Sequence, residues 1–171
     1  MIPAFDPDSG ALPPGDHRAT LEEIAKRLGS TPRRRWLLNG LRAAVEAFWA
    51  SGIHEIYIDG SFCTEKPDPG DIDGYWIEPD PDVYERIDPY WIDFDPVPAP
   101  HTRKRKWRMW IDYGVEFFIH PAMQATPESG FPDFFRQDRD GRPRGVIQVV
   151  KADHDQERRT KRTNGDPDRG I

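Results

Sequence analysis

The segment spanning residues 55–77 constrains the fold more than any other part of the chain. Residues 56–58 are the strand-forming sequence Ile-Tyr-Ile, which ends at Gly60-Ser61, and residues 75–77 are a second such run, Tyr-Trp-Ile, which ends before Pro79. An acidic loop containing two prolines separates the two runs. The sequence therefore predicts two strands joined by a glycine turn and a loop that carries polar groups.

Two carboxylates lie at the end of this loop, at Asp71 and Asp73. On an extended backbone alternate side chains share a face, so these carboxylates point together while Ile72 points away. Mg²⁺ prefers oxygen ligands of this kind and takes its remaining ligands from water and substrate phosphates. Gly60 has no Cβ, so the backbone N–H groups of the Gly-Ser turn can approach a phosphate closely. The pattern predicts a divalent-ion site beside a phosphate-binding turn.

The order strand, Gly60-Ser61, spacer, Asp71-Ile72-Asp73 resembles the signature of the nucleotidyltransferase superfamily. More narrowly, the sequence DGSFCTEKPDPGDID at residues 59–73 is similar to a small bacterial and phage branch of that superfamily, and the likeness extends over residues 2–150. The resemblance implies an α/β fold, with a small mixed β-sheet, helices packed on one side and a palm like that of polymerase β. It also implies one nucleotidyltransferase-like domain over residues 1–150, with an extended N-terminal arm.

A third carboxylate lies in the strand pattern of residues 114–119, where Glu116 is set among apolar residues. A charge in such a setting needs a partner. The resemblance implies a third acid on a strand after the Asp-x-Asp motif, and Glu116 stands in the matching context, although Asp is the commonest residue there. Asp112 is the alternative third acid. The structural alternative is that Glu116 faces water on an edge strand.

The resemblance also implies a reaction. Asp71, Asp73 and Glu116 are expected to be the catalytic residues that hold one or two Mg²⁺ or Mn²⁺ ions, and Gly60, Ser61 and Lys66 to bind a nucleoside triphosphate. The expected reaction transfers a nucleoside monophosphate to an acceptor hydroxyl of a nucleic acid or a protein and releases pyrophosphate.

Two further functions stay open at this point. The chain is alternatively a weakly active or inactive scaffold that binds a protein partner encoded nearby, in a toxin–antitoxin or phage-defence pair, because minimal members of the superfamily often occur in such pairs. A hydrolase that acts on phosphate esters with the same metal site is the other reading.

Composition narrows the class of protein. Hydrophobic residues make up 36% of the chain, and no apolar run approaches the roughly 20 residues that cross a bilayer. Asp6 and Asp8 do not fit a signal peptide. We therefore expect a soluble, cytoplasmic protein without a membrane partner. The single cysteine, Cys63, excludes an intrachain disulfide and is expected to be a small buried filler. A net charge of −6 argues against broad nonspecific affinity for nucleic acid but allows a local basic patch.

Two basic runs are candidate phosphate contacts. Residues 33–35 are three arginines at the start of an expected helix, where cations are disfavoured, and a solvated face is the simpler interpretation. Residues 103–108 interleave basic side chains with Trp107, and Trp110 follows. This run either contacts a triphosphate or nucleic acid, with the aromatic rings available for base stacking, or forms a helix that exposes its basic side chains. The helix is the favoured interpretation.

The remaining elements follow from local signals. Residues 1–17 are expected to form an extended, irregular arm held to the body by Phe5 and Leu12. Helices are expected from the capping box at residues 20–23 to Gly29 and from Thr31-Pro32 to Gly52. A helical turn at residues 83–87, a core anchor at 90–92, a packed turn at 131–135, a final strand at 145–150 and a disordered polar tail at 151–171 complete the prediction.

Overall fold

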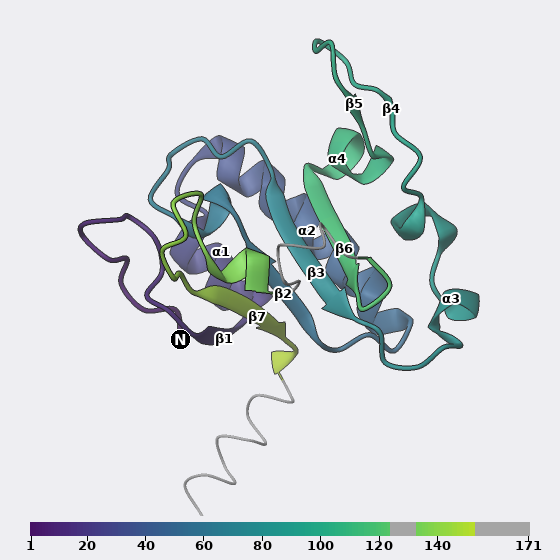
Figure 1. Cartoon of the computed structure of the whole chain (residues 1–171), viewed down its shortest axis with the longest axis horizontal. Helices are drawn as coiled ribbons and strands as arrows, with labels where there is room; N and C mark the ends of the chain where they lie inside the picture. Colours follow the sequence, from purple (N-terminus) through teal and green to yellow (C-terminus); the bar gives the residue numbers. More distant parts are fainter. Residues whose placement is uncertain (124–132, 153–171) are drawn as a thin grey trace, which may run out of the picture.

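A five-stranded mixed sheet forms the centre of the computed structural model, which describes residues 1–123 and 133–152 (Figure 1). The strand order is β1-β7-β2-β3-β6. β2 runs antiparallel to β7 and β3, whereas β1 is parallel to β7 and β6 is parallel to β3. The strands are β1 Asp16–Thr20, β2 Ile56–Asp59, β3 Ile72–Ile77, β6 Val115–His120 and β7 Val146–Val150. The predicted α/β fold with a mixed sheet is confirmed.

Two helices cover one face of this sheet (Figure 1). Helix α1, Leu21–Leu28, begins with the predicted capping box, in which the Thr20 and Glu23 side chains each accept a hydrogen bond from the other residue's backbone N–H. Helix α2, Pro32–Ala50, begins at the Thr31 cap. Its apolar side chains pack on the sheet, as in the edge-to-face contact of Phe48 with Phe117, whose ring centroids lie 5.0 Å apart. The predicted helices and their packing are confirmed.

The N-terminal arm differs from the prediction because it contains a strand. β1 pairs in parallel with β7 from Asp16↔Val146 to Thr20↔Val150. Most of its residues are weak strand formers, and its hydrogen bonds come from a strand far along the chain, so the local sequence carries little signal for it. Leu12 is buried and Phe5 packs against the core, which confirms that these two residues hold the arm to the body.

The segment between β3 and β6 leaves the sheet and returns to it. It contains α3 Val83–Arg86, the short helix η2 Pro89–Ile92, a two-stranded hairpin of β4 Val97–Pro98 and β5 Arg105–Lys106, and α4 Arg108–Tyr113. Trp91 is buried and anchors the segment against Phe48. The expected helix over residues 103–108 is wrong, because the Ala99 N–H donates to the Lys104 carbonyl oxygen and the chain reverses there into a hairpin.

The second face of the sheet carries the polar groups. Tyr57 and Tyr75 stack there with ring centroids 4.8 Å apart, and Phe135 of the short helix η3, Asp133–Arg136, packs against Tyr75. One row further along the strands, this face carries acidic side chains. None of the helices in the described ranges combines the length and apolar character that crossing a membrane requires. Residues 131–132 of the predicted packed turn and residues 153–171 of the predicted tail lie outside the described residues.

Candidate metal centre

Three adjacent strands bring three carboxylates into one row. Asp59 of β2 pairs with Asp73 of β3, and Asp73 pairs with Glu116 of β6. Val115 and Phe117 are buried on the helical face, so the alternation of β6 directs Glu116 to the opposite face, as predicted. Asp71 immediately precedes β3, and Ile72 is fully buried beside it. The expected same-face arrangement of Asp71 and Asp73 therefore agrees with the burial pattern.

Asp71, Asp73 and Glu116 converge. Each of the three carboxyl groups offers an oxygen atom, and these atoms lie within 4.8 Å of one another. Among the described residues, this is the one group of three or more potential ligand side chains that lie close enough together to hold one metal ion. Asp112, the alternative third acid, instead accepts a hydrogen bond of 2.8 Å from the Tyr90 hydroxyl. The structure thus places Glu116, and not Asp112, beside the Asp-x-Asp pair.

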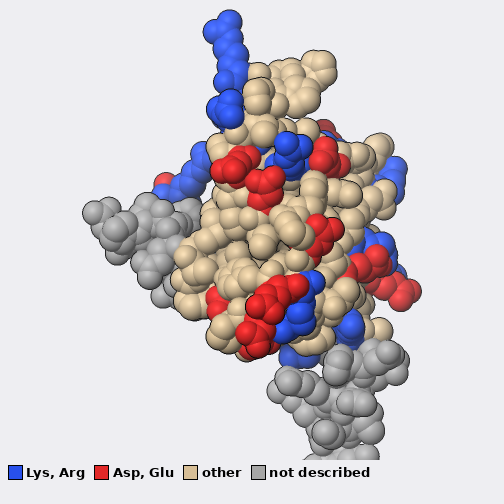
Figure 2. Space-filling model, turned by 90° about the vertical axis from the view of Figure 1, so that its right-hand side faces the viewer, with Lys and Arg blue, Asp and Glu red and all other residues tan. Residues whose placement is uncertain are grey.

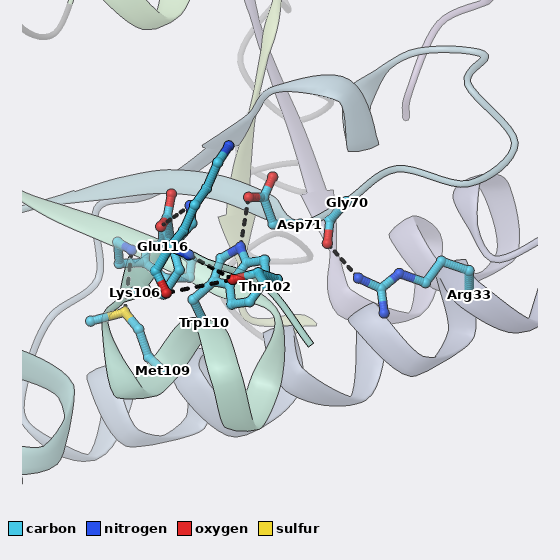
Figure 3. A network of polar contacts seen from close by, with 10 residues as sticks. Arg33, Gly70, Asp71, Thr102, Lys106, Met109, Trp110 and Glu116 are labelled. Carbon is cyan, nitrogen blue, oxygen red and sulfur yellow. Dashed lines mark hydrogen bonds and ion pairs between the residues drawn. The ribbon is translucent and has the colours of Figure 1, made fainter. Parts of the chain in front are cut away.

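Two side chains from the segment between β3 and β6 hold the outer members of this cluster, Glu116 and Asp71 (Figure 3). The Lys106 Nζ atom lies 2.9 Å from Glu116 Oε1, and both side chains are about three-quarters or more buried. The Trp110 indole N–H donates a 2.9 Å hydrogen bond to Asp71 Oδ2, and Lys106 lies over the same indole ring. The hairpin and α4 therefore fix the orientation of two of the three carboxylates.

The turn before the acidic loop is pressed against the central carboxylate. Gly60 has φ 79°, in the left-handed region, and a Cβ atom on it would lie 2.5 Å from Asp73 Oδ2. Only glycine fits this conformation and this approach. Ser61 follows at the start of the short helix η1, Ser61–Cys63. The structure thus brings the Gly60-Ser61 turn to the acidic cluster, as the sequence predicts.

Two arginines at the start of α2 fix the loop that leads to Asp71. Arg33 donates to the carbonyl oxygens of Pro69 and Gly70, directly before Asp71 (Figure 3). Arg34 is 3% exposed and donates to backbone carbonyl oxygens at the end of α1 and in the segment after Gly60, namely those of Leu28, Phe62, Thr64 and Lys66. Neither the phosphate contact nor the solvated face considered for residues 33–35 describes Arg34, which is a buried structural residue.

Lys66 occupies a different place from the other predicted nucleotide ligands. Lys66 is exposed. Its backbone N–H donates to Thr64 Oγ1, and its carbonyl oxygen accepts a hydrogen bond from the Arg34 guanidinium. These backbone contacts place Lys66 in the loop that Arg34 anchors, and its role as a nucleotide ligand stays a prediction. Cys63, in the same region, is buried as expected.

The crowding of carboxylates changes their protonation. Burial, with the nearby charges of Asp71, Glu116 and Asp59, raises the pKa of Asp73 from 3.8 to about 7. Burial likewise raises the pKa of Asp59 to about 6, although the Arg144 guanidinium opposes this shift. Asp73 has no hydrogen-bond or ion-pair donor among the described side chains, whereas Asp59 and Glu116 each have one. In the row Asp59, Asp73 and Glu116, the central carboxylate is therefore the one that forms no ion pair with a described side chain.

Sequence reasoning missed the residues that flank this centre. Asp59 is 1% exposed and pairs with Arg144 at 2.9 Å, but nothing in the local sequence connects residues so far apart. The one available signal for Asp59 is its alternation with Tyr57 on a strand that ends at the Gly-Ser turn. The sequence identified Lys106 as part of a basic run but did not indicate that Glu116 is its partner. The hairpin that brings Lys106 to Glu116 is evident only in the structure.

A surface depression lies away from the acidic cluster. It has a volume of about 500 Å³, and its walls include Phe5, Arg27 and Glu65, but none of the clustered acids. Its lining mixes apolar, hydroxyl and charged residues and includes one carboxylate, Glu65. We therefore assign the candidate chemistry to the acidic cluster and not to this depression.

Comparison with known proteins adds a family and no activity. No curated protein and no solved structure matches the chain. One protein family does match, over residues 3–150, which include every strand, the acidic cluster and its flanking cations. The chain therefore belongs to a family of unknown function, DUF6932.

Proposed function

We propose that this protein is a metal-dependent nucleotidyltransferase whose sheet is a palm like that of polymerase β. The observation that carries the proposal is the convergence of Asp71, Asp73 and Glu116 within 4.8 Å, next to the Gly60-Ser61 turn. The sheet supports the palm assignment, because β2 and β3 are antiparallel neighbours joined through that turn and β6 adds the third acid in parallel.

The donor set fits Mg²⁺ or Mn²⁺. The three carboxylates supply hard oxygen ligands. Among the described side chains, one cation pairs with this cluster: Lys106, which contacts Glu116. The central Asp73 forms no ion pair with a described side chain and has a pKa raised to about 7. When bound, such an ion withdraws electron density from phosphate oxygens and neutralises the charge that develops during phosphoryl transfer.

The residues of the chain have distinct roles in the proposed reaction. Asp71, Asp73 and Glu116 would hold the metal, and the N–H groups around Ser61 would hold the β- and γ-phosphates of a nucleoside triphosphate. The acceptor oxygen attacks the α-phosphorus, and its proton passes to a carboxylate of the cluster. The bond from the α-phosphorus to the bridging oxygen breaks, and pyrophosphate leaves. The acceptor then carries the nucleoside monophosphate.

A second candidate function is a weakly active or inactive nucleotidyltransferase scaffold that binds a protein partner, as in a toxin–antitoxin or phage-defence pair. One observation favours it: the Lys106 ammonium already lies 2.9 Å from Glu116 and offsets part of the charge that a metal would neutralise. In this alternative, Lys106 serves as a permanent internal cation. In the enzyme, metal binding has to compete with Lys106 for Glu116.

Metal binding is the first stage of the test. We expect Mg²⁺ or Mn²⁺ to bind in isothermal titration calorimetry and to raise the melting temperature, and the double substitution Asp71→Asn, Asp73→Asn to remove both effects. Asp112→Asn is the matched control, because Asp112 is an acid of the same region outside the cluster. Equal heats for the wild type and the double variant would end the metal assignment.

Turnover is the second stage of the test. The wild type is incubated with each α-labelled nucleoside triphosphate and Mn²⁺, and both pyrophosphate release and label on an acceptor are measured. Metal binding with release that Asp73→Asn abolishes supports the enzyme. Metal binding without any turnover of the four nucleotides supports the scaffold.

A further inference from the structure

The β4–β5 hairpin concentrates positive charge in a protein whose net charge is −6. We call residues 97–106 the basic arm; it carries Arg103, Lys104 and Arg105 as consecutive exposed residues. Figure 1 shows the arm projecting from the body beyond α4, and Figure 2 shows basic side chains extending from this projection, away from most acidic side chains on the same face. The arm therefore presents a positive surface at a distance from the main body.

The base of the arm lies at the acidic cluster. Lys106, its last residue, contacts Glu116 at 2.9 Å and lies over the ring of Trp110, which bonds Asp71. A ligand that runs along the arm toward its base thus arrives at Asp71 and Glu116. Because the arm and the cluster are joined through these contacts, their relative position is fixed by the fold.

The tip of the arm keeps two cations available. Arg105 is committed to the hairpin, because it donates a 2.6 Å hydrogen bond to the carbonyl oxygen of Pro96. The turn itself is closed by the backbone bond from Ala99 to Lys104. Arg103 and the Lys104 ammonium form no ion pair among the described residues, and both are exposed. These two side chains are free to bind an anionic ligand without disturbing the hairpin.

We propose that the basic arm binds a single-stranded polynucleotide and guides its terminal hydroxyl to the acidic cluster, so that a polynucleotide is the acceptor. The acceptor role rests on the proposed function, whereas binding to the arm does not. A polynucleotide carries one negative charge per nucleotide, which matches the exposed cations Arg103 and Lys104 at the tip of the arm. Its end also offers the hydroxyl that the reaction requires. An acidic protein segment supplies the charge without a terminal hydroxyl placed for attack.

Binding is measured by fluorescence anisotropy with the full-length protein in EDTA, without nucleotide. The probes are labelled 12-nucleotide oligouridylate and oligothymidylate, with a 12-residue polyglutamate peptide as the acidic comparison. The test variant is Arg103→Gln, Lys104→Gln, and the control variant is Lys26→Gln, Arg42→Gln, which removes two exposed cations from the helices on the other face of the sheet.

We expect both oligonucleotides to bind the wild type and the control alike, and the test variant to bind at least tenfold more weakly. The slope of log affinity against log salt concentration should fall in magnitude by about 1.4 in the test variant, at about 0.7 for each lost phosphate contact on a single strand. A preference for one oligonucleotide then assigns RNA or DNA as the polymer. Melting temperatures of both variants check that the fold is intact.

Three results would overturn the inference. These are no oligonucleotide binding by the wild type, equal binding by the test variant, or polyglutamate binding as tight as that of the oligonucleotides, which assigns the arm to an acidic protein. The outcome is separate from that of the metal test, because Asp71→Asn, Asp73→Asn should retain oligonucleotide binding in EDTA. Failure of the arm with intact metal binding leaves the proposed enzyme standing.

Discussion

The substitution Asp73→Asn is expected to stabilise the metal-free protein above neutral pH. The pKa of Asp73 is raised to about 7 in the folded protein by burial and by the neighbouring carboxylates, from 3.8 in the unfolded chain. Between these two values the folded state holds a proton that the unfolded state has lost. Stability therefore falls as pH rises through this window and is constant above it. An asparagine side chain cannot ionise, so the Asp73→Asn variant escapes this loss.

The size of the effect follows from the shift. One pKa unit corresponds to about 1.4 kcal/mol, so a shift of roughly three units gives the variant an advantage of about 4 kcal/mol at pH 8. At pH 5 most of that advantage is absent, and the difference between the two proteins should grow by about 3 kcal/mol from pH 5 to pH 8. Asp59, whose pKa is about 6, contributes a fall of the same sign to both proteins, and the comparison removes it to first order.

Urea denaturation in EDTA at several pH values between 5 and 8 measures this difference. Asp112→Asn, at an exposed carboxylate bonded to Tyr90, should follow the wild type and serves as the control. With Mg²⁺ present, the advantage of the Asp73→Asn variant should shrink, because the ion stabilises the ionised wild-type cluster alone. Parallel stability curves for the wild type and the variant would show that Asp73 is not the electrostatically stressed residue, and the reasoning would be refuted.

Three further substitutions test the surroundings of the cluster. Gly60→Ala should lower the melting temperature by several degrees and weaken Mn²⁺ binding, since its Cβ would meet Asp73 at 2.5 Å in a left-handed backbone; calorimetry and thermal unfolding measure both effects. Arg34→Ala should cost about 3 kcal/mol or more in urea unfolding by leaving buried carbonyl groups unsatisfied, whereas Arg35→Ala, at an exposed neighbour, should change little. Glu116→Gln should reduce the metal-induced rise in melting temperature and lower any nucleotidyl transfer at least about a hundredfold. The stability of the metal-free protein should change little, because the relief of repulsion among the carboxylates offsets the loss of the ion pair with Lys106.

Local signals were sufficient to predict much of the fold. The Thr20 capping box, the Thr31-Pro32 start of α2 and the strands β2, β6 and β7 depend on residues near one another in sequence, and the structure contains all of them. β3 extends further toward its N-terminus than the predicted run at residues 75–77. The acidic residues before that run are unfavourable in isolated strands, but pairing on both sides, with β2 and β6, holds them extended.

The parts that escaped prediction depend on contacts between distant segments. β1 exists because β7 supplies its partner, and the row of Asp59, Asp73 and Glu116 exists because of the register of three strands. Register is set by the packing of the whole sheet and is not written in any one strand. The Asp71 and Asp73 pair was accessible from spacing alone, whereas the partners Arg144 and Lys106 required the three-dimensional structure.

The distribution of charge across the row bears on which proposed function is correct. Arg144 pairs with Asp59 at one end and Lys106 pairs with Glu116 at the other, each at 2.9 Å, while Asp73 in the middle forms no ion pair with a described side chain. An ionised Asp73 costs about 4 kcal/mol, against a total stability of roughly 5–15 kcal/mol that is typical of a domain. A scaffold without chemistry would be more stable with an amide side chain at this position and would lose no hydrogen bond or ion pair to a described side chain. A site that receives a divalent ion recovers the cost on binding, because the ion supplies the missing charge where the row lacks it. The position of the uncompensated carboxylate therefore favours the enzyme over the scaffold.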